Sequence, residues 1–489
     1  MTAPPDLAGQ RVVVLGLGLF GGGAGATRWA LARGADVTVT DLRGEDVLGE
    51  ETAALEAWAE ARGARQRLRF VLGQHERSDV EAADLLVVNP GVPPRAKMLE
   101  VARDAAIPRT TAISLLLDAL PCSAAGVTGT NGKSSTVTFL DQALRASGRR
   151  THLGGNIGGS LLDRAATMDA GDDAVLELSS FQLEHMAAGT RRALRVAAIT
   201  NVERDHLGWH GSVDAYRLAK MRILELVEPG GAAIVPAGPL AAAAREARPD
   251  VTIVDHGRGG ALEVESDGRV RLNGEVLGDL RHLTALGAFQ RENAAVALAA
   301  ARCMGVPAEG TASCIAGLRG LPHRLEPLGE RGIGGGRMEL VDNGVSTTPE
   351  STIAALEALS AAAAAADQRF LLCGGAPKKG LGFEGLAAAA AASGWVLVPF
   401  GDAADALSRA GRDAGAELIA VDPGAPHHEA VALALRGAVR PPGEGSGPAM
   451  VLLSPACASF DGYPNFRARA LAFRRALGGI EPERAISED

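Results

Sequence analysis

A glycine-rich segment that ends in a lysine and two serines carries the clearest chemistry in this chain. Residues 127–135 read VTGTNGKSS, with an apolar strand candidate before them and a predicted helix over residues 134–146. The backbone N–H groups of such loops bind phosphate oxygens, the lysine reaches the β- and γ-phosphates, and a hydroxyl ligates Mg²⁺. The segment departs from the usual G-x-x-x-x-G-K-[ST] spacing because Val127 stands at the first glycine position. The predicted ATP contacts of this loop are Gly129, Thr130, Asn131, Gly132, Lys133, Ser134 and Ser135.

A second glycine motif lies near the N-terminus. Gly16, Gly18 and Gly21 match G-x-G-x-x-G between a strand candidate and a helix candidate, and Asp41 ends the next strand candidate. Taken alone, this pattern predicts a dinucleotide site, because its glycines let a diphosphate approach a helix N-terminus. A nucleotide-sugar diphosphate would fit as well as NAD, and a purely structural turn remains an alternative. The triphosphate loop argues against a simple dehydrogenase, which has no use for ATP.

A lysine falls on the apolar side of a predicted helix. Over residues 212–227, Lys220 lies at the centre of an apolar stripe when residues are placed at 100° intervals. The stripe consists of Val213, Tyr216, Ile223, Leu224 and Val227. One interpretation is a lysine whose stem follows the edge of the core while its ammonium reaches water. The other is a desolvated lysine with a lowered pKa, whose neutral amine adds CO₂ and becomes a carbamate that ligates a metal.

Two further side chains are candidate metal ligands. Glu177 stands where a strand candidate meets a turn, and His206 lies in the polar segment 201–210. Each residue type is more often structural than catalytic when considered by itself. Carboxylate and imidazole ligands suit Mg²⁺ or Mn²⁺ when phosphate oxygens complete the coordination shell.

The elements that must position these residues alternate between short apolar runs and helical patterns. This alternation predicts an α/β fold with parallel sheets in three domains. The predicted boundaries are 1–111, 112–320 and 321–489. The predicted strands are 11–15, 37–40, 85–88, 124–128, 174–178, 196–200, 232–235, 370–373, 395–398, 418–421 and 450–453.

Length and composition set the class of protein. The chain has 489 residues with 47% hydrophobic and 22% charged residues, which is a globular balance that excludes pervasive disorder. A formal net charge of −9 and 3% aromatic residues speak against a nucleic-acid surface. The five cysteines are far apart and predict buried thiols in a reducing compartment. No signal-like or membrane-spanning segment is predicted, so we expect a cytoplasmic protein without a membrane partner.

Seven motifs in order along the chain resemble the ATP-dependent Mur ligases of peptidoglycan synthesis. They are GTNGKS (129–134), GGNIG (154–158), ELSSFQLE (177–184), NVERDH (201–206), QREN (290–293), HR (323–324) and SPACASF (454–460). The resemblance implies a Rossmann-like N-terminal domain, a central P-loop-type ATPase domain with a mostly parallel sheet, and a Rossmann-like C-terminal domain. It covers nearly the whole chain.

The resemblance also implies an activity. The motifs around residues 177–184 and 454–460 are similar to those of the ligases that add D-glutamate to UDP-N-acetylmuramoyl-L-alanine. In these enzymes the L-alanyl carboxylate attacks the γ-phosphate of ATP, and the D-glutamate amine attacks the resulting acyl phosphate to form an amide. Catalysis then consists mainly of positioning and charge neutralisation. We expect a monomer that acts on these small molecules.

Site residues follow by motif. The resemblance implies Lys133 on the phosphates, Ser134 and Glu177 on one Mg²⁺, and His206 with carbamylated Lys220 on a second. The remaining ATP contacts it implies are Asn293, Arg324 and Asp342. The residues it implies for the UDP-sugar substrate are Leu19, Phe20, Asp41, Leu42, Arg43, Asn89, Gly91 and Asn156. Those for D-glutamate are Thr347, Lys379, Ser454 and Phe460, with Lys378 as the neighbouring alternative to Lys379.

One loop departs from the family. The usual order is Asn-Asp-Ser-Lys-Ala-Thr, whereas residues 342–347 read DNGVST, so that acid and amide are exchanged and Val345 replaces the lysine. Either Asp342 takes over the role of the acid or the nucleotide contact is weaker here. The alternatives that remain are a sister Mur ligase, an L-glutamate-adding variant, an NAD(P)-dependent oxidoreductase and a non-catalytic ATP-binding module.

Overall fold

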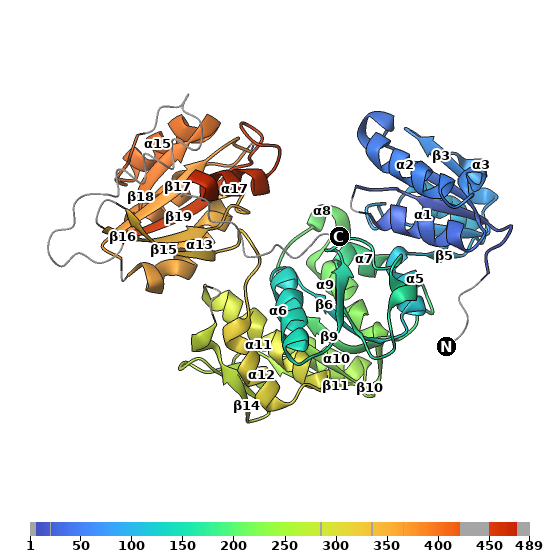
Figure 1. The fold of residues 1–489 in the computed structure, drawn as a ribbon, viewed down its shortest axis with the longest axis horizontal. Helices are drawn as coiled ribbons and strands as arrows, with labels where there is room; N and C mark the ends of the chain where they lie inside the picture. The colour runs from blue at the N-terminus through green and yellow to red at the C-terminus, as the bar shows by residue number, and fades with distance from the viewer. Residues whose placement is uncertain are drawn as a thin grey trace. The chain divides into compact units, whose positions relative to one another are not determined.

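The structure is a computed structural model that describes residues 6–19, 21–283, 286–333, 336–364, 366–378, 380–420 and 449–476 (Figure 1). Two of the predicted contact residues, Phe20 and Lys379, lie outside the described residues, as does Val421 of a predicted strand. The chain forms two compact units. One comprises Met1–Arg281 with Asn293–Gly317, and the other His282–Glu292 with Leu318–Asp489.

The N-terminal sheet has five parallel strands in the order β3-β2-β1-β4-β5. These are β1 (Arg11–Leu15), β2 (Asp36–Asp41), β3 (Leu68–Leu72), β4 (Leu85–Val88) and β5 (Arg109–Thr110). Residues 12–15 of the central strand are buried throughout, as a parallel strand covered by helices on both faces requires. The helices are α1 (Gly22–Ala32), α2 (Glu45–Glu60), α3 (Arg77–Glu81) and α4 (Lys97–Asp104).

The central sheet has nine strands in the order β14-β13-β12-β11-β10-β9-β6-β8-β7. The parallel part consists of β6 (Ser123–Thr128), β7 (Thr151–Gly155), β8 (Asp173–Glu177), β9 (Leu194–Ile199), β10 (Val227–Pro236), β11 (Thr252–His256) and β12 (Leu262–Val264). Two antiparallel strands, β13 (Arg269–Leu272) and β14 (Glu275–Asp279), extend one edge. The helices are α5 (Ala112–Ala119), α6 (Lys133–Ala146), α7 (Ser180–Glu184), α8 (Leu207–His210), α9 (Val213–Met221), α10 (Pro239–Ala247), α11 (Ala288–Cys303) and α12 (Ala308–Cys314).

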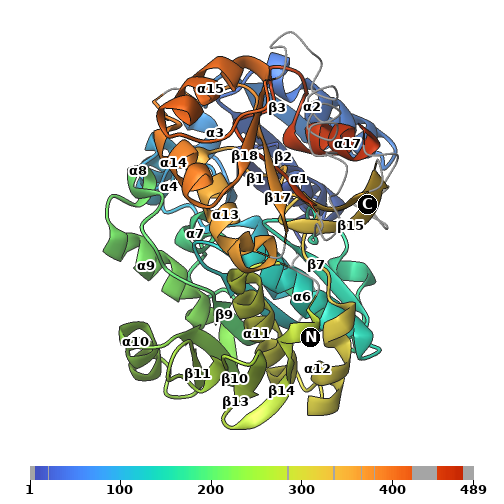
Figure 2. The same ribbon diagram turned by 90° about the vertical axis from the view of Figure 1, so that its left-hand side faces the viewer.

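The C-terminal sheet has five strands in the order β15-β16-β19-β17-β18. Its strands are β15 (Glu326–Ile333), β16 (Gly336–Asp342), β17 (Gln368–Gly374), β18 (Val396–Phe400) and β19 (Ala449–Ala456), all parallel except for the β15–β16 hairpin. Separate apolar clusters cover its two faces. The helices are α13 (Pro349–Ala363), α14 (Glu384–Ala392), α15 (Ala404–Asp413) and α17 (Phe466–Ala476), and Figure 2 shows the first three of them together with β17 and β18.

The expected α/β class with three mostly parallel sheets is confirmed. The predicted helix over residues 212–227 is wrong in its extent: α9 ends at Met221, a 3₁₀ turn covers Arg222–Leu226, and Val227 begins β10. Val213, which we placed on the buried stripe, is exposed. Of the strand predicted at 418–421, the described residues form a single bridge between Leu418 and Leu397.

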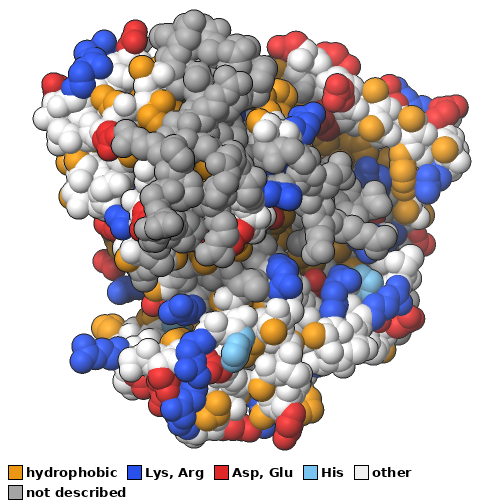
Figure 3. Space-filling view, turned by 60° about the vertical axis from the view of Figure 1, so that its left-hand side comes forward, with side chains coloured by type: hydrophobic (Ala, Val, Ile, Leu, Met, Phe, Trp, Pro, Cys, Tyr) orange, Lys and Arg blue, Asp and Glu red, His pale blue; other side chains and the backbone are white. Residues whose placement is uncertain are grey.

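The surface is mixed in charge. On the face drawn in Figure 3, the described Lys and Arg side chains are interspersed with Asp and Glu side chains. Within the described ranges, no helix combines the length and apolarity needed to cross a bilayer.

Candidate active site

The segment between β6 and α6 folds as a phosphate-binding loop. Gly132 caps the helix with a left-handed φ of 81°, and a Cβ at this position would come within 2.2 Å of the Asn293 side-chain oxygen. The N–H of Thr130 donates to the carbonyl of Asn201 at 2.9 Å, and the N–H of Asn131 donates to the Asn201 side-chain oxygen at 2.9 Å. The segment that follows β9 therefore holds the loop in place.

Gly132→Ala is expected to lower ATP affinity by at least about tenfold, because the loop backbone and its N–H groups must shift to make room for the methyl group. Isothermal titration with ATP and a thermal melt would measure this. Gly148→Ala is the matched control, because Gly148 follows the same helix with a φ of 80° but has nothing within 4 Å of its would-be Cβ. It should lose stability and keep its ATP affinity. Equal affinities of the two variants would contradict the packing argument.

Two lysines share one carbonyl of this loop. The ammonium groups of Lys133 and Lys220 donate to the carbonyl of Gly129 at 2.9 and 2.6 Å. Lys133 also donates to the carbonyl of Thr130 at 2.9 Å. Its ammonium thus contacts two backbone carbonyls of the loop. The structure brings together two cations that are 87 positions apart in the chain.

Lys220 does not follow the edge of the core into solvent. It is 1% exposed, and its Nζ lies 4.4 Å from the centre of the Tyr216 ring. Burial and, to a smaller extent, the charge of Lys133 together lower its pKa to about 7, against the opposing charge of Asp205. The amine is therefore available in its neutral form near physiological pH.

Glu177 ends β8 with one oxygen unsatisfied. The strand register places it beside Val127 of β6, next to the phosphate loop. Its Oε1 accepts from the side-chain amide of Asn156 at 2.9 Å, whereas the buried Oε2 has no hydrogen-bond partner among the described residues. The hydroxyl of Ser135 is buried with no described partner as well. A carboxylate oxygen in this position is costly unless a cation meets it, so the donors fit a hard divalent ion such as Mg²⁺.

The ring of His206 also lies near Tyr216. This histidine has a left-handed φ of 50°, and its ring lies 6.0 Å from the Tyr216 ring and 5.0 Å from the Phe181 ring. The side chain is 45% exposed, and its Nε2 lies 3.3 Å from an oxygen of Asp205. The Tyr216 ring thus contacts both lysine and histidine candidates. The sequence contained no signal for this aromatic bridge beyond the apolar stripe.

A partly buried triad, which the sequence did not indicate, supports these elements. The Nδ1 of His210 lies 3.0 Å from Oε2 of Glu184, and its Nε2 lies 3.1 Å from the hydroxyl of Ser180. Burial lowers the pKa of His210, although the charge and the hydrogen bond of Glu184 act in the opposite direction. The pairing ties α8 to both ends of α7. Residue spacing carried no indication of it, since Ser180 and His210 are 30 positions apart.

Asp41 turns towards its own glycine loop. Its Oδ2 accepts from the N–H groups of Leu17 and Gly18 at 3.0 and 3.2 Å, and its carboxylate also pairs with Arg43. Burial acts against the charged form, but hydrogen bonds from Arg43 and Gly18 hold the pKa of Asp41 below its usual value. The two N–H groups that the glycine motif offered to a diphosphate are thus already used by a carboxylate.

Three more of the predicted UDP-sugar residues, Leu19, Asn89 and Gly91, lie in or beside this loop, and Leu42 follows Asp41. Leu19 and Leu42 are apolar side chains that are 44% and 68% exposed. The side-chain oxygen of Asn89 accepts from the N–H of Gly91 at 3.0 Å, and its amide nitrogen lies 3.4 Å from the carbonyl of Leu17. The side chains of Leu19 and Leu42 are thus exposed apolar groups beside the loop.

The segment after Asn156 packs against α1. A Cβ on Gly25 would come within 2.2 Å of the Ser160 hydroxyl, and Arg28 pairs with Asp163 at 2.7 Å. Asn156, which holds Glu177, is therefore part of a segment that also contacts the helix that follows the N-terminal glycine loop.

The C-terminal unit holds the predicted amino-acid contacts. The hydroxyl of Thr347 accepts from the ammonium of Lys378 at 3.1 Å, and Phe460 is 76% exposed. Ser454 is fully buried, and its hydroxyl accepts from Asn343 at 3.0 Å and lies 2.9 Å from the hydroxyl of Thr352. Direct contact between the Ser454 side chain and an amino acid thus has no support in this structure, because that hydroxyl already has two protein partners.

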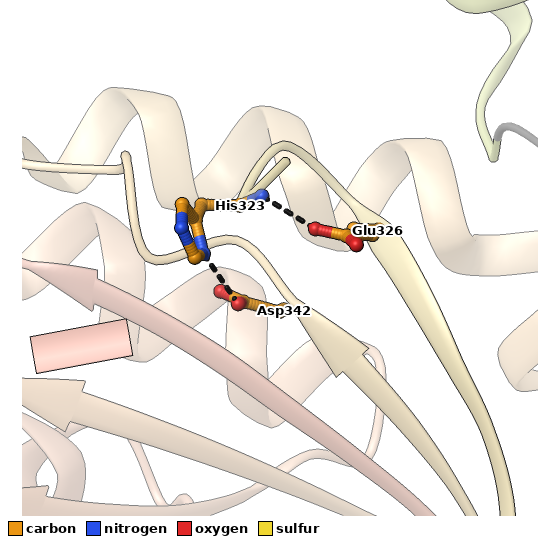
Figure 4. A group of neighbouring side chains, drawn as sticks. All are labelled: His323, Glu326 and Asp342. Atoms are coloured by element: carbon orange, nitrogen blue, oxygen red, sulfur yellow. Dashed lines mark hydrogen bonds and ion pairs between the residues drawn. The ribbon is translucent and has the colours of Figure 1, made fainter. Parts of the chain in front are cut away.

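Asp342 has an equally internal environment (Figure 4). Its Oδ2 lies 2.7 Å from Nδ1 of His323 and 2.9 Å from Nε of Arg474, and its Oδ1 accepts from the N–H of Gly344 at 2.8 Å. Although burial acts to raise it, the pKa of Asp342 is held below its usual value by His323 and Arg474. The expectation that this carboxylate contacts ATP gains no support, since it has no exposed surface and both oxygens are engaged.

The three sheets agree with comparisons to known proteins. Residues 10–110 match the Mur ligase MurD-like N-terminal domain, and residues 127–301 match the Mur ligase middle domain. Two solved structures share the fold at 16% identity. The UDP-N-acetylmuramate-alanine ligase MurC of Thermotoga maritima has a TM-score of 0.53 over 96% of this chain and 98% of its own. A UDP-N-acetylmuramoyl-L-alanyl-D-glutamate–2,6-diaminopimelate ligase has a TM-score of 0.55 over 83% and 94%.

Sequence relatives are closer. The UDP-N-acetylmuramoylalanine–D-glutamate ligase of Anaeromyxobacter dehalogenans (strain 2CP-C) is 37% identical over 97% of this chain and 98% of its own length. That of Roseiflexus sp. (strain RS-1) is 36% identical over 96% and 99%. Likeness of this degree over nearly the whole length, with matching domains in the same order, means that the chain belongs to the UDP-N-acetylmuramoylalanine–D-glutamate ligases of the Mur ligase family.

Proposed function

We propose that this chain uses ATP to join D-glutamate to UDP-N-acetylmuramoyl-L-alanine, in the cytoplasm and as a monomer. The observation that carries the proposal is the grouping at the carboxyl ends of β6 and β8. Lys133 and Lys220 meet at the carbonyl of Gly129, and Glu177 keeps a buried oxygen free for a cation beside them. The names of the sequence relatives supply the substrates.

In the first step, the L-alanyl carboxylate attacks the γ-phosphorus of ATP. The bond from this phosphorus to the oxygen that bridges it to the β-phosphate breaks, so that ADP leaves as the acyl phosphate forms. Backbone N–H groups of residues 129–135 bind the phosphates, and Lys133 offsets their charge. Asn293, which packs against Gly132, lies where it would contact the nucleotide. Asn156 holds Glu177 in place and would contact the reacting end of the acceptor.

Mg²⁺, or Mn²⁺ in its place, supplies charge neutralisation for the transferred phosphate when bound. Ser134 and Glu177 would hold one ion, and His206 with carbamylated Lys220 would hold a second. A carbamate keeps one N–H on the lysine nitrogen, so the hydrogen bond from Lys220 to Gly129 can persist while the new carboxylate turns towards the metal.

In the second step, the free amine of D-glutamate attacks the acyl phosphate carbonyl, and the tetrahedral intermediate expels phosphate to leave the amide. Thr347, Phe460 and the Lys378–Lys379 pair would bind D-glutamate, with an ammonium near its side-chain carboxylate. Exposed Leu19 and Leu42, together with Phe20 and Arg43, would bind the UDP group beside Asn89 and Gly91. We place the working domains at residues 1–111, 112–320 and 321–489.

Phosphate release from ATP is expected only when UDP-N-acetylmuramoyl-L-alanine and D-glutamate are both present. A coupled phosphate assay with the purified chain, omitting each substrate in turn and replacing D-glutamate by L-glutamate, measures this. Turnover with L-glutamate but not with D-glutamate would reject the amino acid while keeping the ligase class. Nucleotide binding without an amide product under any pairing would instead identify a non-catalytic module, which the Val345 departure allows for.

A further inference from the structure

Helix α17 carries two buried arginines. Arg469 and Arg474 are 2% and 1% exposed, and a separation of five residues points them about 140° apart around the helix. Burying a guanidinium is costly unless its N–H groups find hydrogen-bond acceptors. The acceptors of each arginine therefore show which segment of the chain it holds in place. The two segments are different: one surrounds residue 324, far from α17 in the chain, and the other comes shortly before α17.

Arg474 holds the turn that carries Arg324. Its guanidinium lies 2.8 Å from Oδ2 of Asp342 and 3.2 Å from Nδ1 of His323, and it also pairs with Glu326. The Glu326 carboxylate in turn accepts from the N–H of His323 at 2.7 Å (Figure 4). Arg474 thus joins Asp342, His323 and Glu326 in one network. This network holds the chain on both sides of Arg324.

The held turn has an unfavourable backbone. His323 and Leu325 have left-handed φ values of 62° and 47°, which non-glycine residues rarely adopt. The N–H of Leu325 is fixed by the side-chain oxygen of Asn343 at 3.2 Å. Such a conformation persists only where the surroundings impose it, and it aims the intervening Arg324 in one direction.

Arg469 holds the segment that precedes Phe460. Its guanidinium donates to the carbonyls of Ala458 at 2.9 Å and Cys457 at 3.0 Å, and to that of Gly374 at 3.3 Å. Ala456, at the start of this segment, has a left-handed φ of 61°. Among the described residues of this unit, His323, Leu325 and Ala456 are the non-glycine residues with positive φ. All of them lie in the two segments that α17 holds.

The ring around Arg474 also resembles a metal site, because ligand atoms of His323, Glu326 and Asp342 lie within 4.8 Å of one another. The guanidinium of Arg474 contacts all of these side chains and supplies the positive charge that their carboxylates require. A second cation beside it would be repelled. The cluster is therefore an ion-pair network, in which Nη1 of Arg474 is the guanidinium nitrogen that lacks a hydrogen-bond partner among the described residues.

We propose that α17 is a positioning helix for both substrates of the C-terminal unit, with Arg474 orienting the nucleotide-binding Arg324 and Arg469 orienting the amino-acid segment up to Phe460. This inference rests on the proposed function, which assigns ATP to Arg324 and D-glutamate to Phe460. The two arginines touch neither substrate. They act through the backbone of the segments that they hold, so their effects on the two substrates are separable.

The test is a matched set of variants in the complete chain. Arg474→Met should raise the KM for ATP by about tenfold or more and change the KM for D-glutamate less than about twofold, and Arg469→Met should do the reverse. Arg475→Gln is the control, because this exposed arginine on the same helix makes a single hydrogen bond among the described residues, to the carbonyl of Leu471. Thermal melts of every variant show whether it folds, and Arg→Lys at each position should give a smaller shift in the same KM.

Each outcome bears on the inference. Folded variants whose two KM values rise together, or whose kcat alone falls, would overturn it. So would failure of both the Met and the Lys variant of either arginine to fold, because that arginine would then be a requirement of the fold. If the wild-type chain turns over neither glutamate enantiomer, the proposed function fails separately, and calorimetric ATP titration of the Arg474 variants still decides the nucleotide half.

Discussion

Lys220→Ala is expected to lower kcat by about 10²–10³-fold or more, the usual effect of removing one charge-stabilising group from an enclosed active site. The substitution removes the amine that sits 2.6 Å from the Gly129 carbonyl and with it the carbamate that would hold a metal. Acetate or formate at high concentration should restore part of the activity, since a free carboxylate can enter the space that the side chain leaves. A phosphate-release assay across a series of short carboxylates measures both effects.

Two controls separate chemistry from packing at this position. Lys220→Met fills the same space without an amine, so it should be as inactive as the alanine variant, as stable as the wild type, and insensitive to carboxylates. In the wild type, a pKa of about 7 means that the amine is neutral above that pH and charged below it. Because CO₂ adds only to the neutral form, reactivation of CO₂-depleted enzyme by bicarbonate should slow as the pH falls below about 7. Full activity of Lys220→Met would exclude the carbamate.

Glu177→Gln is expected to reduce kcat by at least about 10²-fold and to shift the Mg²⁺ requirement to higher concentration. The glutamine can keep the hydrogen bond from Asn156 through one oxygen, but its amide nitrogen replaces the unsatisfied Oε2 and cannot ligate a cation. The free energy of unfolding should not fall, because the change removes a buried charge that has no protein partner on one oxygen. Turnover measured against MgCl₂ concentration, together with a thermal melt, tests both statements.

Glu203→Gln is the matched control for Glu177. Glu203 is an exposed acid whose carboxylate accepts from the side chain of Asn131 in the same phosphate loop at 3.1 Å. Its replacement should change kcat less than about tenfold, since an exposed carboxylate is screened by water. Equal losses of kcat in the two variants would mean that the loop needs negative charge in general. The unsatisfied oxygen of Glu177 would then not explain the loss.

The phosphate loop was predictable because its contacts are local. Gly132, Lys133 and the start of α6 are consecutive in the chain, so a motif of a few residues specifies the helix N-terminus and its N–H groups. Lys220 was found for a related reason: Tyr216, Ile223 and Leu224 are buried beside it. The predicted apolar stripe is buried around Lys220 although the helix ends at Met221. The 3₁₀ turn that follows the helix directs Ile223 and Leu224 into the core.

Contacts between distant segments were not predictable in this way. Asp41 was expected to face a ligand, yet it accepts from the backbone of Leu17 and Gly18, because the register of β1 and β2 brings its carboxylate to the turn. Asp342 was expected to contact a nucleotide, yet it pairs with Arg474, which lies 132 positions away. The sequence alone does not show whether a charged side chain pairs with a ligand or with a residue far away in the chain.

By itself, the sequence determined the α/β class and the phosphate loop and placed Lys220 on an apolar stripe, because short-range periodicity and consecutive backbone groups specify these features. Only the tertiary structure decided which polar atoms are left without a partner. Glu177 and Asp342 are both buried acids at strand ends, but the fold brings one amide to the first and an arginine, a histidine and a backbone N–H to the second. Satisfaction of a buried charge depends on where segments far apart in the chain meet, and that difference separates a candidate metal ligand from a structural ion pair.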